Sequence, residues 1–439
     1  MRSINQQVLE NLIRLLVYFI ERKINPLSTK ERSVSELVHY YSEIIRNWNK
    51  INFIFLRKLK STKKIVIFGN YSIAKFYIAI YRIIWEKENV LKVGTELNFP
   101  PRTIDLLKNL SSFSWNKELS GLYDTEKLSL QLAVPSFMIS KLIDVLDFDS
   151  IRANINYMDR QGDHPIFYFR INNLVLNETQ KNKVDSILTE LRKQGIKVKQ
   201  DEHFSELFIT NSKNKKKLIS SSFYNENEIV ILDKASYTVA HLLNPRPNEL
   251  VFDMCAAPGI KTSMTALLSQ NKSIIIANDF NLSRVYAMSR VLNNLSVGNT
   301  HLINSDSIAF PFRFNNFFDK ILLDAPCTGS GTFSTNPEIK WRQNEGFLHQ
   351  NITLQKKLLK SAIDLLKPSG ILVYSTCSLY PEEGENQIRD VLDELKPMDL
   401  PKWIAPSYKI NGKSLPGTGR LIPPIHKTKG FFIAKFKKK

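Results

Sequence analysis

The carboxy-terminal half of the chain alternates short apolar runs with helix-like segments, and this alternation limits the fold more than any other feature. The apolar runs are Leu250–Met254, Ser273–Ala277, His301–Ile303, Lys320–Leu323 and Ile371–Tyr374. Strands that alternate with helices favour a doubly wound, mostly parallel sheet. We therefore predict an α/β domain over residues 226–439.

The first 130 residues have a different pattern. Apolar side chains such as Leu9, Leu12 and Leu16 recur at spacings of three and four, which indicates amphipathic helices. Glycine is nearly absent before Gly69. We predict an independent, all-helical domain over residues 1–130.

Residues 131–225 combine helix and strand signals. The extended aromatic run Ile166–Ile171 precedes a polar helix at Gln180–Gln194, and a further strand-like run follows. We predict a small α/β module here, with a basic loop at Asn211–Lys217.

The composition favours an anionic partner. The chain of 439 residues has 61 lysines and arginines against 42 acidic residues, a net charge of +19, and its 43% hydrophobic content can fill several cores. Such a charge suits nucleic acid or a membrane surface. The clustered basic residues are Arg57, Lys58, Lys60, Lys63, Lys64, Lys213–Lys217 and Lys437–Lys439. For each cluster the alternative interpretation is an ordinary solvent-exposed surface that binds no partner.

The chain has three cysteines and no CxxC pair, which argues against a disulfide framework and a structural zinc site. The apolar run Val8–Ile20 contains Glu10, Asn11 and Arg14, so it is too short and too polar to span a bilayer. No secretory signal is visible at the start. We expect a cytoplasmic protein with no metal and no membrane contact.

A small-residue turn follows the first strand of the predicted sheet, in FDMCAAPGIKT (Phe252–Thr262). Pro258, Gly259 and the small Ala256 and Ala257 allow backbone amides to approach a ligand. The helix that starts behind them favours a carboxylate or a phosphate. An ordinary strand-to-helix turn is the plain alternative, but a string of this length is more specific than a glycine turn.

Acidic residues end the next two strands. Asp279, in NDF, can accept both hydroxyls of a ribose, and Asp306, in SDS, can accept from an adenine amino group. Each residue can equally cap the helix that follows it.

Two further motifs each place a cysteine at the end of a predicted strand. LLDAPCTGSGT (Leu322–Thr332) contains Asp324 and Cys327, and YSTCSLYPEEGE (Tyr374–Glu385) contains Cys377. A lone cysteine is usually an inert, buried residue. Because all three cysteines of the chain fall at such strand ends, we expect at least two to belong to a site.

These three motifs together resemble the RNA (cytosine-5) methyltransferases of the RsmB and Nop/Sun type. Two motif cysteines, one after Asp-Ala-Pro and one within Ser-Thr-Cys-Ser, distinguish that family from the DNA cytosine methyltransferases. The resemblance covers about residues 130–439 and includes VILDKAS (Val230–Ser236) and GFFIAKF (Gly430–Phe436). By position and helicity, the first 130 residues resemble the NusB-like RNA-binding domain of RsmB-type enzymes.

The resemblance implies a Rossmann-like, S-adenosylmethionine-dependent methyltransferase domain and a role for each motif residue. The turn that would hold the methionine part of S-adenosylmethionine consists of Cys255, Ala256, Ala257, Pro258, Gly259, Ile260 and Lys261. Asp279 would hold the ribose, Asp306 would lie at the adenine, and Asp324 would lie near the methyl donor and the target base. Cys377 would be the nucleophile, and Cys327 would assist product release.

Ile260 departs from the family pattern, which most often has a second glycine there. We expect Gly259 alone to allow the backbone to approach the cofactor closely, and we expect Ile260 to make the pocket slightly tighter. Arg284 contacts either the cofactor or RNA, and the sequence leaves this open.

The resemblance implies a cytosine-C5 methyltransferase that binds RNA, with ribosomal RNA as the first expected substrate and transfer RNA as the alternative. A non-catalytic ribosome-assembly factor of the same fold has no need of both cysteines and Asp324. A nicotinamide-dependent dehydrogenase is disfavoured, because no G-x-G-x-x-G follows the first strand. We expect a monomer.

Overall fold

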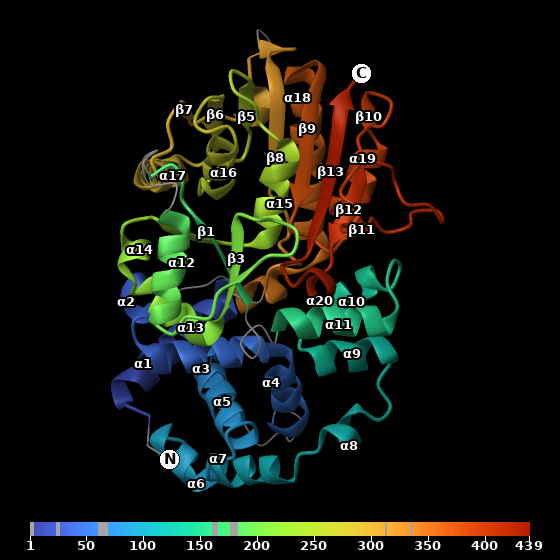
Figure 1. Ribbon diagram of the computed structural model, residues 1–439. Helices are drawn as coiled ribbons and strands as arrows, with labels where there is room; N and C mark the ends of the chain where they lie inside the picture. The colour runs from blue at the N-terminus through green and yellow to red at the C-terminus, as the bar shows by residue number, and fades with distance from the viewer. Residues whose placement is uncertain are drawn as a thin grey trace. The chain divides into compact units, whose positions relative to one another are not determined.

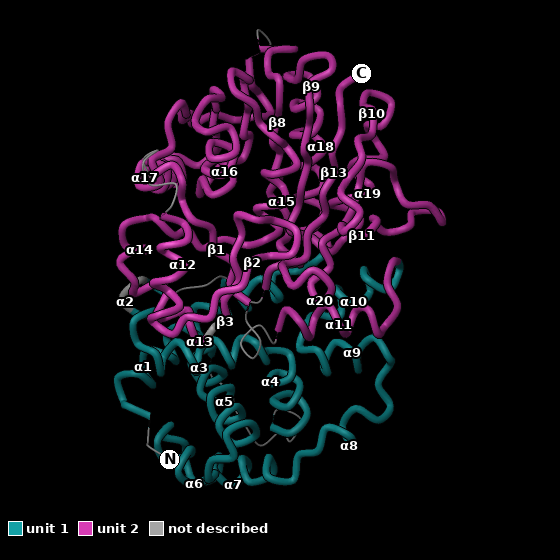
Figure 2. Tube along the Cα trace, in the orientation of Figure 1, with its two compact units in different colours: residues 1–144, 335–344 teal, residues 145–334, 345–439 magenta. Residues whose placement is uncertain are grey.

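The computed structural model describes residues 4–22, 27–59, 69–159, 166–175, 183–311, 314–333 and 336–439 (Figure 1). The chain separates into two compact units (Figure 2). Unit 1 comprises residues 1–144 and 335–344, and unit 2 comprises residues 145–334 and 345–439. The predicted division into domains 1–130, 131–225 and 226–439 remains a proposal.

Unit 1 contains helices and no strand within its described residues. They are α1 (Gln6–Arg22), α2 (Thr29–Arg32), α3 (Ser35–Arg46), α4 (Trp48–Ile54), η1 (Phe55–Leu59), α5 (Gly69–Ile84), α6 (Val90–Glu96), α7 (Pro101–Leu107), η3 (Lys108–Ser112), α8 (Trp115–Leu119), α9 (Asp124–Leu132), α10 (Ser136–Leu142) and η8 (Pro337–Arg342). The apolar stripe of α1 is buried, as its spacing predicts, in a core shared with α3 and α5. Although η8 lies far along the chain, the Trp341 indole packs on this core and donates to the Ile45 carbonyl at 2.7 Å.

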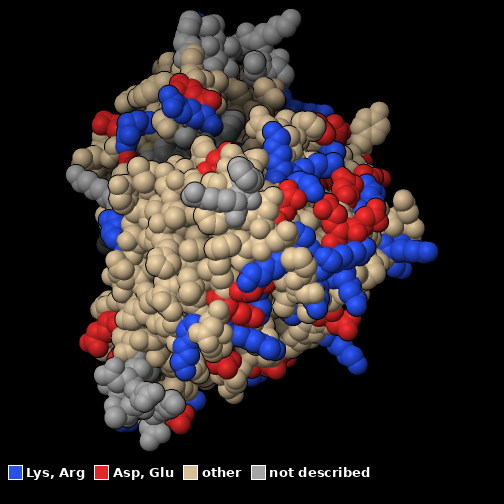
Figure 3. Space-filling model, turned by 90° about the horizontal axis from the view of Figure 1, so that it is seen from above, with Lys and Arg blue, Asp and Glu red and all other residues tan. Residues whose placement is uncertain are grey.

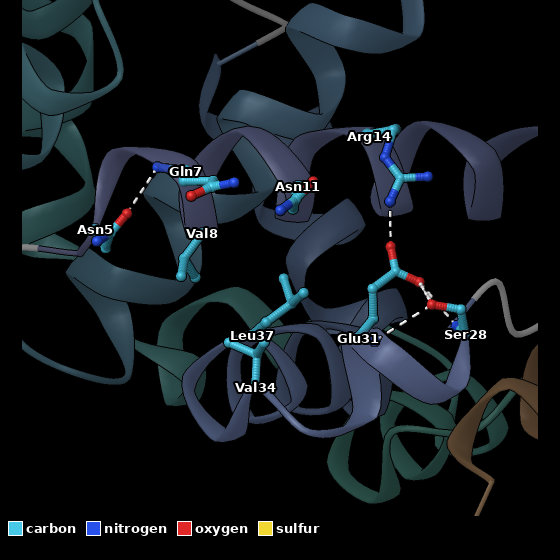
Figure 4. A pocket seen from close by; sticks show the side chains of 9 residues that line it. All are labelled: Asn5, Gln7, Val8, Asn11, Arg14, Ser28, Glu31, Val34 and Leu37. Carbon is cyan, nitrogen blue, oxygen red and sulfur yellow. Dashed lines mark hydrogen bonds and ion pairs between the residues drawn. The ribbon is translucent and has the colours of Figure 1, made fainter.

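A groove of about 480 Å³ runs along α1 beside α2 and α3 (Figure 4). Its lining residues are Asn5, Gln7, Val8, Asn11, Arg14, Ser28, Glu31, Val34 and Leu37. Arg14 and Glu31 form an ion pair at one end, and Ser28 donates to the same carboxylate. The two charged residues of the groove therefore neutralise each other.

Unit 2 begins with α11 (Phe148–Asp159) and a small antiparallel sheet of strand order β2-β3-β1-β4. The strands are β1 (Ile166–Ile171), β2 (Lys199–Gln200), β3 (Leu207–Asn211) and β4 (Ile229–Leu232), and the helices are α12 (Lys183–Lys193), α13 (Ser212–Ile219) and α14 (Ser222–Asn225). Phe169, Leu191 and Leu218 are fully buried between the sheet and its helices. Strands β1 to β3 lie within residues 131–225, where a small α/β module is expected, whereas β4 lies beyond them.

The predicted basic loop Asn211–Lys217 is wrong, because most of this segment is helix α13. The Asn211 side chain accepts from the Asn214 amide at 3.1 Å and caps the helix, and Leu218 anchors it in the core. The basic cluster Lys437–Lys439 lies at the end of strand β13, which continues to Lys438, and the Lys438 ammonium donates to the Ile363 and Leu366 carbonyls.

The larger sheet has the order β11-β12-β13-β9-β8-β5-β6-β7, with β10 paired to β13. Its strands are β5 (Leu250–Asp253), β6 (Ile274–Asn278), β7 (Thr300–Ile303), β8 (Phe318–Asp324), β9 (Leu366–Thr376), β10 (Leu395–Pro397), β11 (Ala405–Pro406), β12 (Thr418–Leu421) and β13 (Phe431–Lys438). Strands β5 to β9 pair in parallel, and β10 to β13 pair antiparallel. The predicted α/β fold with a mostly parallel sheet is confirmed.

Helices cover both faces of this sheet. They are α15 (Lys234–Leu243), α16 (Ile260–Leu268), α17 (Leu282–Asn294), α18 (Glu345–Leu365), α19 (Glu385–Arg389) and α20 (Pro423–His426). Neighbouring residues of a strand enter opposite cores: Phe252 packs with residues of α18, whereas Val251 packs with residues of α15. Burial on both faces is the reason that these strands are continuously apolar in sequence.

We expect Phe252→Ala to destabilise unit 2 by about 3–5 kcal/mol, because it empties a fully buried site between Phe318 and Phe310. Urea unfolding followed by circular dichroism measures the change. Phe280→Ala is the matched control, since 77% of Phe280 is exposed. Equal losses from the two variants would contradict this description of the core.

Candidate active site

The carboxyl ends of four parallel strands bring the sequence motifs to one edge of the large sheet. In register, Asp253 of β5 pairs with Ala277 of β6 and Leu322 of β8, and Asp324 of β8 pairs with Ser375 of β9. The loops that follow these strands therefore meet at the same edge. Ligands of open α/β sheets bind at such an edge, where the strand order reverses.

The turn after β5 is held by backbone bonds to both neighbouring strands. The Met254 amide donates to the Leu322 carbonyl at 3.0 Å, and the Ala256 amide donates to the Asn278 carbonyl at 2.7 Å. Gly259 has φ +97°, and a β-carbon there would lie 3.0 Å from Met288 Cγ. Glycine is thus required both by the backbone conformation and by the packing of α17.

Helix α16 starts directly after this turn, at Ile260, and no side chain caps its first amides. The free N–H groups of the first turn remain available to an anionic group. Ile260 packs against the apolar cluster that contains Tyr237 and Met264. This packing gives a physical reason for isoleucine at the position where the motif resemblance leads one to expect a second glycine.

Asp279 is buried at the end of β6, where Arg284 holds it. An Arg284 guanidinium nitrogen lies 3.3 Å from Asp279 Oδ2, and another donates to the Ala257 carbonyl at 2.6 Å. Asp279 Oδ1 also accepts from the Asn281 amide at 3.0 Å. Arg284 thus ties the turn after β5 to the turn after β6, whereas its predicted contact with cofactor or RNA stays a prediction.

Asp306 is exposed and caps a short helical turn, since it accepts from the Ile308 amide at 2.9 Å. Its proposed place at an adenine stays a prediction. Nearby, the buried Asn278 side chain donates to the Met254 and Ser305 carbonyls at 3.3 and 3.0 Å. Asn278 joins the ends of three strands, and the sequence analysis missed it.

Lys261 and Asp324 form an ion pair in the site. The Lys261 ammonium lies 2.6 Å from Asp324 Oδ2, and the Ser375 hydroxyl donates to Asp324 Oδ1 at 2.6 Å. Burial lowers the pKa of Lys261, but the charge and hydrogen bond of Asp324, together with the charges of Cys377 and Asp253, outweigh burial, and the net shift is upward. A charged ammonium therefore remains fixed beside the cysteine segments.

Cys327 and Cys377 lie side by side, with their Sγ atoms 3.1 Å apart. The hydrogen bond between the two cysteines lowers the pKa of Cys377, and the Lys261 charge lowers it further. The same contact and burial raise the pKa of Cys327. Cys377 is thus the better thiolate of the pair, and the thiolate is the nucleophilic form.

Cys255 differs from the other two cysteines. Burial raises its pKa well above the ordinary value, and the neighbouring Asp253 charge adds to the effect. Burial also raises the pKa of Asp253 to about 7, although its carboxylate accepts from the Thr262 hydroxyl at 2.8 Å. Cys255 therefore remains a thiol and is unsuited to nucleophilic attack.

The described part of the chain holds no group of three or more histidine, cysteine or acidic side chains placed to bind a metal ion. None of the helices described combines the length and apolarity that crossing a membrane demands.

The model of a family described as 16S rRNA methyltransferase RsmB/F matches residues 240–437 of the chain. The tRNA (cytosine(49)-C(5))-methyltransferase of Pyrococcus abyssi is 33% identical over 224 residues, which cover 49% of this chain and 72% of that protein. The chain belongs to the RsmB/F family. The resemblance drawn from the motifs is thereby confirmed.

Other RsmB/F relatives are larger. The 28S rRNA (cytosine-C(5))-methyltransferase of Mus musculus is 39% identical over 208 residues, 45% of this chain. The match spans only 26% of that protein's length. Among solved structures, PH0851 superposes on this chain with a TM-score of 0.78 at 25% identity, and the alignment covers 100% of each of the two chains.

We expect Lys261→Met to move the pH profile of Cys377 alkylation to higher pH. Iodoacetamide reacts with the thiolate, so the rate rises with pH through the Cys377 pKa. Loss of the Lys261 charge removes a group that lowers this pKa. Mass spectrometry of the Cys377 peptide measures the rate between about pH 5 and pH 10, a range that brackets the ordinary pKa of a thiol. Lys272→Met, at an exposed lysine, is the control, and coinciding profiles would contradict the proposed effect.

Proposed function

We propose that this chain is an S-adenosylmethionine-dependent RNA methyltransferase that methylates carbon 5 of cytosine through a covalent cysteine intermediate. The observation that carries the proposal is the pair of thiols 3.1 Å apart, beside the Lys261–Asp324 ion pair. A nucleophile and a second proton-transfer group at one place suit a reaction that must both form and break a bond to the base. We further propose a cytoplasmic monomer.

The edge of the sheet offers complementary groups for S-adenosylmethionine, which supplies a methyl group on a sulfonium. The uncapped amides at the start of α16 suit its carboxylate. The Asp279 carboxylate, at the end of β6, suits its ribose hydroxyls. Arg284 holds this carboxylate in place.

Carbon 5 of cytosine is a poor nucleophile within an aromatic ring. Attack of the Cys377 thiolate on carbon 6 forms a carbon–sulfur bond, breaks the aromaticity and gives carbon 5 enamine character. Lys261 and the Cys327 thiol favour the thiolate that this step requires. Asp324, held by Lys261 and Ser375, is the group that we assign to protonate or hydrogen-bond ring nitrogen 3, which lowers the cost of the charge that develops on the ring.

After methyl transfer, the proton on carbon 5 must leave and the carbon–sulfur bond must break. Cys327 is the group that we assign to this step, directly or through water. Its thiol lies next to the sulfur that departs, so it can give its proton to that sulfur, and the Cys327 thiolate so formed takes the proton from carbon 5. General acid–base assistance of this kind contributes about 10²–10⁴-fold to a rate.

The target base has to be reached from above and below its ring, so it must be unstacked, in single-stranded or flipped-out RNA. Exposed lysines of α13 (Lys213, Lys216 and Lys217) are the phosphate contacts that we propose. Lys58, another basic residue named in the sequence analysis, is not among these proposed contacts, because it ion-pairs with Glu118.

Lys60, Lys63 and Lys64 lie outside the described residues. On the face seen in Figure 3, basic and acidic side chains are interspersed. This face therefore offers no single positive patch, and we base the proposed phosphate contacts on α13.

Ribosomal RNA is the substrate that we propose, because a helical region precedes the methyltransferase domain, as in RsmB-type enzymes. Transfer RNA is the second candidate, and the relative from Pyrococcus abyssi, a tRNA methyltransferase, supports it. The paired cysteines argue against a non-catalytic assembly factor.

Bisulfite sequencing of total RNA, from cells with and without this protein, tests the function directly. We expect one cytosine to lose its bisulfite resistance when the protein is absent, and a ribosomal position would support the first candidate. A transfer RNA position would favour the second. Identical maps would contradict the enzymatic function.

The two cysteines should give opposite results on a denaturing gel. Cys377→Ala should abolish methylation and form no covalent RNA adduct, because the attacking sulfur is gone. Cys327→Ala should still attack but release poorly, so a protein–RNA adduct should accumulate. A trapped band from Cys377→Ala alone would reverse the two assignments.

A further inference from the structure

Glu383 lies behind the two cysteines and is fully buried in the short helix η9 (Pro381–Glu383). Its carboxylate binds the segment that carries Cys327. It accepts from the Thr328 amide at 2.9 Å and from the Thr328 hydroxyl at 2.5 Å. Thr328 is the residue next to Cys327, so these bonds fix the backbone where the cysteine is attached.

The backbone of the same residue binds the strand that leads to Cys377. The Glu383 carbonyl accepts from the Tyr374 hydroxyl at 2.9 Å and from the Thr376 hydroxyl at 3.1 Å. Both donors belong to the last residues of β9 before Cys377. One residue is thus bonded to both cysteine segments.

Gln355 of α18 completes this arrangement from the other side of Cys327. Its amide nitrogen donates to the Pro326 carbonyl at 2.7 Å and to Glu383 Oε1 at 3.0 Å. The residues before and after Cys327 are therefore both held, and the carboxylate accepts from Thr328, from Gln355 and also from the Ser378 hydroxyl. Burial raises the pKa of the Glu383 carboxyl, and these donors, which stabilise its charged form, offset that effect only in part.

We propose that Glu383 is a positioning residue that holds Cys327 against Cys377, so that the release step of the reaction depends on its hydrogen bonds. This inference rests on the proposed function, because release by Cys327 is part of it. Catalytic groups act only within narrow limits of position, and a displacement of about 1 Å can cost 10²-fold in rate. The 3.1 Å separation of the sulfurs is the distance that Glu383 maintains.

The variants separate the hydrogen bonds of Glu383 from its charge. Glu383→Ala removes every side-chain hydrogen bond of this residue. Glu383→Gln keeps them in a neutral form, because its oxygen can accept from Thr328 N and its nitrogen can donate to the Thr328 hydroxyl. Thr328→Val removes the hydroxyl bond to Glu383 and keeps the bond from the Thr328 amide. Thr418→Val is the matched control, since that buried hydroxyl donates to Ser407 Oγ at 2.7 Å instead.

Two readouts are needed, and one does not depend on activity. The first is the covalent protein–RNA adduct on a denaturing gel. The second is the rate at which diamide joins Cys327 and Cys377 into a disulfide, measured by peptide mass spectrometry. In that reaction each thiol gives one hydrogen to diamide, which is reduced to a hydrazine while the sulfurs are oxidised and joined.

We expect Glu383→Ala to accumulate the adduct, as Cys327→Ala does, and to form the disulfide at least about tenfold more slowly, which corresponds to about 1.4 kcal/mol. Thr328→Val should show both effects in weaker form. Glu383→Gln and Thr418→Val should resemble the wild type. A purely structural role would instead lower methylation and adduct together.

Wild-type disulfide rates in both Glu383→Ala and Thr328→Val would overturn the proposal. Equal defects in Glu383→Gln and Glu383→Ala would overturn it too, because the charge and not the hydrogen bonds would then matter. If Glu383→Ala fails to fold, Thr328→Val decides. If Cys327→Ala gives no adduct while the disulfide rates change as expected, the release mechanism fails and the positioning role stands.

Discussion

The parallel pairing of β8 with β9 is the interaction on which the site depends. Their register sets Asp324 opposite Ser375, and the chain continues from there to Cys327 on one side and Cys377 on the other. A shift of one residue would turn each side chain to the other face of the sheet. The buried apolar residues on both faces of these strands fix the register, so the core determines the distance between the two sulfurs.

Charged groups around this pairing are mutually compensated. Lys261 meets Asp324, and Arg284 meets Asp279. The buried Arg420 pairs with Glu385 at 2.6 Å and donates to the Ser378 carbonyl, which follows Cys377. Removing one partner of such a pair leaves an uncompensated charge, at a cost of about 3–5 kcal/mol when it is buried. Stability and site geometry thus depend on the same contacts.

The sequence predicted the parallel strands closely, because burial on both faces makes them short apolar runs. The predicted run Ser273–Ala277 corresponds to β6 (Ile274–Asn278), for example. Of the antiparallel strands, β1 was predicted as the run Ile166–Ile171. The antiparallel strands β10 to β13 of the large sheet were not predicted, since their pairing joins residues far apart, as in Phe432 with Thr376. The helix at Ser212–Ile219 was missed because the segment is rich in lysine and has no amphipathic pattern of apolar residues. Only one leucine, Leu218, anchors it in the core.

The site was predicted in part for a similar reason. Motif residues that end strands, such as Asp324 and Cys377, can be located from the strand pattern alone. The roles of Asn278 and Glu383 depend on bonds to distant segments, and a buried glutamate looks like a surface residue in sequence. Only the folded chain shows that Glu383 accepts from Thr328, which lies 55 residues away.

The central claim is that Cys377 attacks carbon 6 of a cytosine at this edge of the sheet. RNA that carries 5-fluorocytosine at the target position tests it most directly, because fluorine cannot leave carbon 5 as a proton does and the covalent intermediate persists. Proteolysis and mass spectrometry of the trapped complex then identify the attached residue. We expect the methylated fluorocytosine on the Cys377 peptide. Attachment to Cys327, or no covalent complex in the presence of S-adenosylmethionine, would contradict the account.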